Sequence, residues 1–274
     1  GDPDRPTPEP IINAAHHALA VPEHHRYDES ANGYVPFLEA AAAWFQNRFG
    51  VSLNPATELL HTIGSKEGLA HLNWSLLNPG DLALVPDPAY TVYKVNARMA
   101  GADVYEMKMG PENGWKPVLS DIPTDVAKRT KLMTINYPNN PTGAVADLSY
   151  FEEVVAFARQ YDIIVCQDAA YSEVHYDGFM PPSILQVPGA KDLAVEMHSL
   201  SKTFNMTGWR LGFAAGNADV IGILGKLKSN VDSKGFMAIS AAGAYALSEQ
   251  AHSLDETLAL FTRRRDALVD GLNA

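Results

Sequence analysis

The stretch from His198 to Asn217, HSLSKTFNMTGWRLGFAAGN, places two cations, Lys202 and Arg210, in a polar segment between two apolar runs. Both runs have the short apolar pattern that is typical of buried strands. An ammonium group at the end of a buried strand is unfavourable, because burial penalises the charged form. A lysine tolerates such a position when it is neutral or covalently linked, so Lys202 is the first candidate functional residue.

Apolar runs and helical patterns alternate along the chain on both sides of this stretch. Helices are expected over residues 9–20, 36–50, about 65–77, 90–100, 148–162 and from 218 onward. The strands expected between them are LLHTI, LALVP, ADVYEM, KLMTINY, IIVCQD, AVEMHSLS and LGFAAGN. Strands separated by helices predict an α/β fold with three α/β/α layers and a mostly parallel central sheet.

The composition narrows the possible partners and the compartment. A formal charge of -11 repels nucleic-acid phosphates, and the one basic cluster, TRRRD, is expected to be a solvated helix face. No apolar stretch approaches the roughly 18 residues of a membrane span. Cys166 is the single cysteine and lies in an apolar run, which favours a buried inert thiol in a reducing, cytoplasmic compartment.

Polar side chains follow several of the expected strands, where ligands bind in open α/β sheets. Ser65 and Lys66 follow LLHTI, and Asn140 lies in PNNPTG after KLMTINY. Asp168 ends IIVCQD, and Tyr171 comes three residues later. Each has a purely structural explanation as well: Ser65 and Asp168 are possible helix caps, and PNNPTG is a possible turn.

Taken together, these strand ends would bring an imine-forming amine, an acid, amide and phenol donors and a phosphate cradle to one crevice. Pyridoxal 5'-phosphate (PLP), an aldehyde with a pyridine ring and a phosphate, uses all of these groups. We therefore expect Lys202 to bind the aldehyde. The guanidinium of Arg210 is expected to bind the phosphate oxygens.

The motifs GSKEG, DPAY, NYPNNPTG, DAAY and SLSKTFNMTGWRLG occur in an order that resembles the class I/II aminotransferases, the fold-type I enzymes that depend on PLP. The resemblance covers almost the whole chain. GDPDRPTPEPI, GSKEGLAHL and SLSKTFNMTGWR are most similar to the LL-diaminopimelate aminotransferase subgroup.

The resemblance implies a role for each matching residue at the ring of the cofactor. Lys202 would be the Schiff-base lysine and the proton-transfer base. Asp168 would pair with the pyridine nitrogen, and Asn140 and Tyr171 would hydrogen-bond the phenolic oxygen. Tyr90, in DPAY, would stack on the ring face.

The remaining matches concern the phosphate, the substrate and a second subunit. The residues implied at the phosphate are Ser65, Lys66, Ser199 and Arg210. Tyr27, in HHRYDESANGY, resembles the tyrosine that reaches the phosphate of the neighbouring subunit, which implies a homodimer with shared sites. Gly1 resembles a position near the substrate carboxylate. No metal ligands are expected, because the adjacent histidines of the two His-His pairs would not share a helix face.

The expected activity is transamination between an amino acid and a 2-oxo acid, with LL-diaminopimelate, alanine or aspartate as donor and 2-oxoglutarate as acceptor. Residues 1–274 would form the PLP-binding large domain, trimmed at both ends. Residues 1–20 would be a lead-in segment, and a helix over about 252–274 would lead toward a C-terminal small domain that holds the substrate-carboxylate arginine. The alternatives are a PLP-dependent carbon–sulfur β-lyase, a non-catalytic PLP-binding sensor and an inactive fragment.

Overall fold

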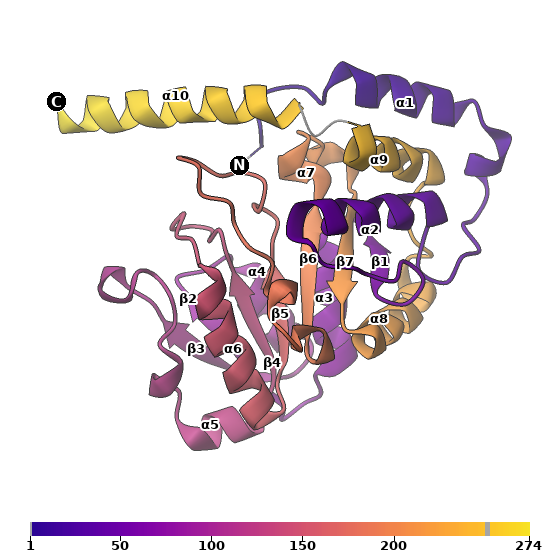
Figure 1. Cartoon of the computed structure of the whole chain (residues 1–274). Coiled ribbons are helices and arrows are strands. Elements are labelled where there is room, and N and C mark those ends of the chain that lie inside the picture. The colour runs from indigo at the N-terminus through magenta and orange to yellow at the C-terminus, as the bar shows by residue number, and fades with distance from the viewer. Residues whose placement is uncertain (1, 250–252) are drawn as a thin grey trace.

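The computed structural model describes residues 2–249 and 253–274 and contains one seven-stranded sheet with helices on both faces (Figure 1). The strand order is β1-β7-β6-β5-β4-β2-β3, and the sheet is parallel except for β7, which runs antiparallel to both β1 and β6. The strands are β1 (Leu59–Thr62), β2 (Leu82–Asp87), β3 (Asp103–Lys108), β4 (Thr130–Asn136), β5 (Ile164–Asp168), β6 (Ala194–Ser199) and β7 (Gly212–Gly216). The expected α/β fold with a mostly parallel sheet is confirmed.

The helices are α1 (Glu9–Leu19), α2 (Val35–Phe49), α3 (Ser65–Leu76), α4 (Val92–Met99), α5 (Thr124–Arg129), α6 (Leu148–Tyr161), α7 (Leu200–Thr203), α8 (Ala218–Val231), α9 (Met237–Glu249) and α10 (Ser253–Asn273).

Two apolar cores separate the sheet from its helical layers. Phe45, Phe151 and Ala242 belong to the core under α2, α6 and α9. Leu72, Ala97 and Leu224 belong to the core under α3, α4 and α8.

The register of the sheet decides which strand ends meet. Asn136 of β4 pairs with Asp168 of β5, and Asp168 pairs with Met197 of β6, so the ends of β4 and β5 are level and β6 extends two residues further at the same edge. Since β7 is antiparallel, its first residue lies at the same edge: Gly212 pairs with both Thr62 and Ser199. The sheet therefore gathers the segments after β1, β4, β5 and β6, and the segment before β7, at one edge.

The stretch after β6 differs from the expected strand AVEMHSLS. The strand ends at Ser199, and the short helix α7 begins at Leu200. The side chain of Ser199 accepts a hydrogen bond from the N–H of Ser201, which caps α7 and turns the chain out of the sheet. This turn carries Lys202 to the sheet edge rather than along the strand.

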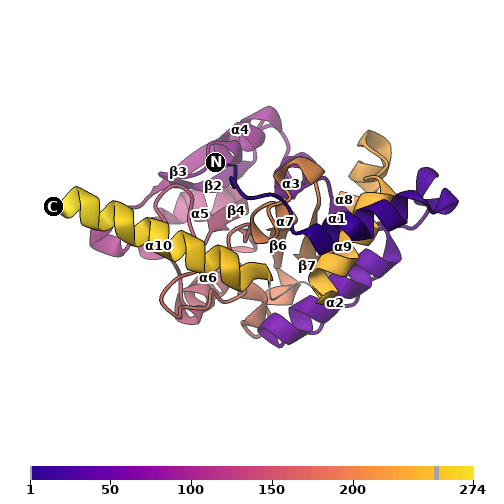
Figure 2. The ribbon, with the colours of Figure 1, turned by 90° about the horizontal axis from the view of Figure 1, so that it is seen from above.

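The N-terminal segment lies beside α10, which projects beyond the sheet as a long rod with the C-terminus at its far end (Figure 2). Asp4 accepts two hydrogen bonds from the guanidinium of Arg264 in α10, at 2.8 and 2.7 Å. Of the helix expected over 252–274, residue 252 lies outside the described residues.

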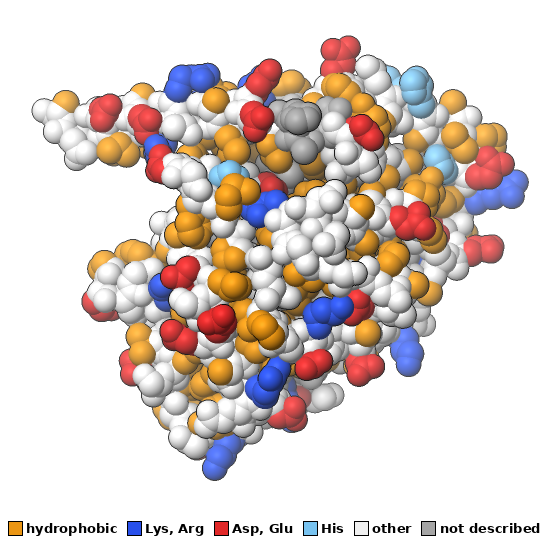
Figure 3. Space-filling model, viewed as in Figure 1, with side chains coloured by type: hydrophobic (Ala, Val, Ile, Leu, Met, Phe, Trp, Pro, Cys, Tyr) orange, Lys and Arg blue, Asp and Glu red, His pale blue; other side chains and the backbone are white. Residues whose placement is uncertain are grey.

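No described helix combines the length and apolar character that crossing a bilayer requires. On the face in Figure 3, acidic and basic side chains are interspersed.

Candidate active site

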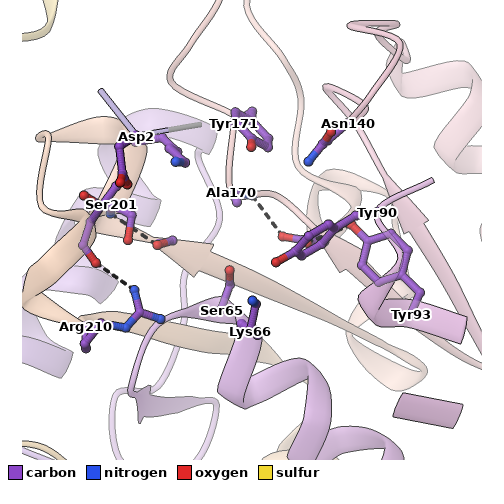
Figure 4. A pocket seen from close by; sticks show the side chains of 14 residues that line it. Asp2, Ser65, Lys66, Tyr90, Tyr93, Asn140, Ala170, Tyr171, Ser201 and Arg210 are labelled. Carbon is purple, nitrogen blue, oxygen red and sulfur yellow. Dashed lines mark hydrogen bonds between the residues drawn. The ribbon is translucent and has the colours of Figure 1, made fainter. Parts of the chain in front are cut away.

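A cavity of about 630 Å³ opens at the sheet edge where these strand ends meet (Figure 4). This volume lies within the usual range of small-molecule sites. Every residue predicted at the cofactor except Tyr27 lines it. The lining consists of Asp2, Ser65, Lys66, Tyr90, Tyr93, Asn140, Asp168, Ala170, Tyr171, Ser199, Ser201, Lys202, Thr207 and Arg210.

Asp168 ends β5 with its carboxyl group almost fully buried, at 4% exposure. Its Oδ2 accepts a hydrogen bond from the hydroxyl of Tyr93 at 2.8 Å, and its Oδ1 accepts one from the N–H of Ala170 at 3.2 Å. Burial raises the pKa of Asp168 to about 6, although these two hydrogen bonds act in the opposite direction. A cation in the cavity would favour the ionised carboxylate, because an opposite charge within a few ångströms lowers a carboxyl pKa.

Amide and phenol groups approach the cavity from the loops after β4 and β5. The Nδ2 of Asn136 donates to the carbonyl of Asp168 at 2.7 Å, while its Oδ1 accepts the N–H of Asn140 at 2.7 Å. This pair of bonds ties the two loops together. The side chains of Asn140 and Tyr171 lie close to each other at the cavity wall (Figure 4). Burial, followed by the charge of Asp168, raises the pKa of Tyr171, so its hydroxyl remains a donor.

Lys202 lies in α7 and lines the cavity. Burial lowers the pKa of its ammonium group. The nearby charge of Arg210 acts in the same direction, while the carboxylate of Asp2 opposes the shift. The neutral amine is thereby favoured, and this is the form that attacks an aldehyde or accepts a proton.

Arg210 faces the amino-terminal end of α3, where Ser65 is the first helical residue. The guanidinium donates from Nη2 to the carbonyl of Ile63 at 3.2 Å and from Nη1 to the carbonyl of Thr207 at 2.8 Å. Gly64 has a φ of 76°, and a Cβ there would lie 2.6 Å from Nη2 of Arg210. The positive φ favours glycine, and a Cβ would also displace the end of the Arg210 side chain. A helix N-terminus, a hydroxyl and a guanidinium together form an anion cradle.

The aromatic wall of the cavity consists of Tyr90 and Tyr93, whose rings meet edge to face at 5.9 Å. The Nζ of Lys66 lies 5.6 Å from the centroid of the Tyr90 ring, a cation–π distance. Lys66 thus lies between the aromatic wall and the anion cradle.

Tyr27 lies outside the cavity and is 82% exposed, between α1 and α2. Gly1, expected near the substrate carboxylate, lies outside the described residues. The structure adds side chains that the sequence analysis missed: Asp2, Tyr93, Ser201 and Thr207. Tyr93 follows Tyr90 by three residues, one helical turn, and this aromatic spacing is a signal that could have identified it.

The donor set of the cavity fits PLP. Lys202 offers the aldehyde an amine whose lowered pKa favours the reactive neutral form. Asp168 offers a buried carboxyl group whose raised pKa would fall beside a protonated ring nitrogen. The cradle at Ser65 and Arg210, with a glycine of positive φ at position 64 between them in the turn, suits the phosphate.

The chain belongs to the aminotransferases of class I and II, because the model of that family matches residues 1–274. It is a PLP-dependent aminotransferase that transfers an amino group between an amino acid and a 2-oxo acid, which confirms the predicted family, cofactor and reaction.

Its relatives include the LL-diaminopimelate aminotransferase of Moorella thermoacetica, which is 52% identical over 274 residues, all of this chain and 70% of that protein. The enzyme of the same name from Syntrophobacter fumaroxidans is 53% identical over 272 residues, 99% of this chain and 70% of that protein. An aminotransferase from Staphylococcus aureus superposes with a TM-score of 0.96 at 35% identity, covering 100% of this chain and 72% of that one.

Replacing Asp168→Asn should raise the free energy of unfolding of the ligand-free protein at pH 7 by about 1–3 kcal/mol. The carboxyl pKa is about 6 when folded, against 3.8 ordinarily, so the unfolded chain loses this proton first. The stability of the wild type relative to that of the variant should therefore fall as the pH rises from about 4 to 6. Urea unfolding at several pH values measures the difference. The control is the exposed Asp121→Asn, and parallel curves for Asp168→Asn and the wild type would contradict the expectation.

Proposed function

We propose that this aminotransferase acts on LL-diaminopimelate, with 2-oxoglutarate as acceptor, and that its cofactor is held by the residues of the cavity. The observation that carries the proposal is the convergence of Lys202, Asp168 and Arg210 on one cavity of about 630 Å³. The choice of donor is supported by relatives named LL-diaminopimelate aminotransferase at 52% and 53% identity along essentially the whole chain.

Bound PLP supplies an aldehyde that captures amino groups covalently and a protonated ring that accepts electrons. Lys202 would hold the aldehyde carbon through its amine, at the position that the amine of the substrate would take over. The same amine, whose lowered pKa favours the neutral form, would accept the proton from the α-carbon of the substrate. One side chain thus serves first as a covalent anchor and then as a base.

The other side chains keep the cofactor in place and keep its ring protonated. Asp168 would hold the proton on the pyridine nitrogen, and Tyr93 keeps the carboxylate oriented by its hydrogen bond. Tyr171 and Asn140 would donate to the phenolic oxygen, and Tyr90 would stack on the ring. Ser65, Lys66, Ser199 and Arg210 would bind the phosphate.

Incubation with PLP, reduction with borohydride and peptide mass spectrometry should place one pyridoxyl group on Lys202. Lys202→Ala should give no adduct. Lys66→Ala is the matched control, because it removes a second cavity lysine yet should retain the adduct on Lys202. An adduct on another lysine in the wild type would refute the assignment.

Among amino donors, LL-diaminopimelate should give a kcat/KM at least about tenfold above those of alanine and aspartate, because contacts to its second charged end add transition-state binding. A coupled assay of glutamate formed from 2-oxoglutarate measures this. Equal kcat/KM values for the three donors would rule out LL-diaminopimelate as the preferred donor but would leave transamination as the reaction. Pyruvate released from cystathionine would instead favour the β-lyase.

We further propose a homodimer in which Tyr27 completes the phosphate site of the other subunit. Its high exposure and its place outside the cavity support a role beyond its own subunit. Mixing Tyr27→Phe with Lys202→Ala subunits should restore tight PLP binding to about a quarter of the sites, because each hybrid dimer has one site with both native residues. If sedimentation shows that the dimers exchange subunits and tight PLP binding still does not return, the shared site is excluded.

We also propose that residues 1–274 form the PLP-binding large domain and that the enzyme acts in the cytoplasm. All described strands belong to one sheet, and the single cysteine is a buried free thiol, as is typical of a reducing compartment. Limited proteolysis and cell fractionation test these two proposals.

A further inference from the structure

A partly buried group of charges lies between α3 and the end of α8, outside the phosphate cradle. Lys228 is only 1% exposed, and its Nζ donates to Glu67 Oε2 at 3.1 Å and to Asp232 Oδ2 at 2.9 Å. His71, one turn after Glu67 on α3, contacts Glu67 Oε1 through Nδ1. These four described residues lie outside the lining of the cavity.

The ligand atoms of Glu67, His71 and Asp232 lie within 4.8 Å of one another, a spacing that would suit a metal ion. The ammonium group of Lys228 already bridges the two carboxylates. Burying a further cation beside it would be strongly unfavourable. The cluster must therefore have another use.

Glu67 links this cluster to the anion cradle. The same Oε2 that binds Lys228 accepts the N–H of Ile63 at 2.7 Å, in the turn between β1 and α3. The carbonyl of Ile63 accepts Nη2 of Arg210. One residue of the turn is thus held from the cavity side by Arg210 and from the far side by Glu67.

The helix that carries Glu67 is itself fixed against the sheet. A Cβ at Gly68 would lie 2.9 Å from Sδ of Met197 and 3.1 Å from Cγ2 of Thr62, so α3 packs with almost no clearance on β6 and β1. Since α3 is fixed in this way, the Glu67 carboxylate is a firm anchor for the turn at Ile63.

We infer that Glu67, clamped by Lys228, is a positioning residue for the phosphate of the cofactor. It sets the turn at Ile63 and Gly64, and through that turn the placement of Arg210 and the N-terminus of α3. This inference rests on the proposed cofactor site. It concerns only the phosphate end, because Asp168 and Lys202 are held by other elements.

The test compares the dissociation constants of PLP and of pyridoxal, which has the same ring and aldehyde but no phosphate. Glu67→Gln should weaken PLP about tenfold, which is the effect of one charge-assisted hydrogen bond, and change pyridoxal less than about twofold. Lys228→Met should act in the same direction. The double variant should be no worse than the more affected single variant, because the two residues act as a unit.

Lys226→Met is the matched control, since Lys226 lies on the exposed side of α8 and should leave both constants unchanged. Equal weakening of PLP and pyridoxal, or no change for either, would overturn the inference. Circular dichroism and thermal melting show whether each variant folds. If Lys228→Met fails to fold, the two dissociation constants of Glu67→Gln alone decide. If the wild type bound pyridoxal as tightly as PLP, the proposed phosphate cradle itself would be wrong.

Discussion

The active site depends on the antiparallel pairing of β7 between β1 and β6. Gly212 is the point at which the three strands meet, since it pairs with Thr62 on one side and Ser199 on the other. A Cβ on this residue would lie 2.4 Å from the carbonyl oxygen of His198, so only glycine allows the strands to approach. Because β7 begins here, the residues before it, including Arg210, reach the same edge as the residues after β1 and β6. A parallel β7 would have placed Arg210 at the opposite edge.

The cavity shifts the pKa values of two ionisable groups away from their ordinary values. The pKa of Asp168 is raised to about 6 and that of Lys202 is lowered, in both cases chiefly by burial. Both shifts favour the neutral form of the group, because burial penalises its charged form. A ligand that brings a cation to Asp168 and a carbonyl carbon to Lys202 relieves both penalties. Stability is therefore lower without the cofactor, as is common where a site is built for function.

Much of this site could be predicted because its residues occur in local motifs at strand ends. Asp168, Asn140 and Lys202 follow apolar runs, and parallel strands bring such ends together. The direction of β7 could not be read from the pattern of LGFAAGN, since an apolar run has the same form in both directions. Tyr93 was missed because its partner Asp168 is 75 positions away. The contact of Glu67 with Lys228 spans 161 positions and joins two helices, so no local spacing indicates it.

The same strand arrangement imposes an order of assembly on the growing chain. The segment β6–α7–β7 is nearly continuous in sequence, so the pairing that brings Lys202 and Arg210 together closes only a short loop. In contrast, β1 must wait for β7, because Leu59 pairs with Ala215. During synthesis on the ribosome, the residues of the turn at Gly64 emerge early. The turn has no guanidinium partner until residue 210 has emerged. The nascent polypeptide therefore completes its pocket for vitamin B6 only when β1 has paired with β7. This pairing is slow, because the paired residues lie far apart in the sequence.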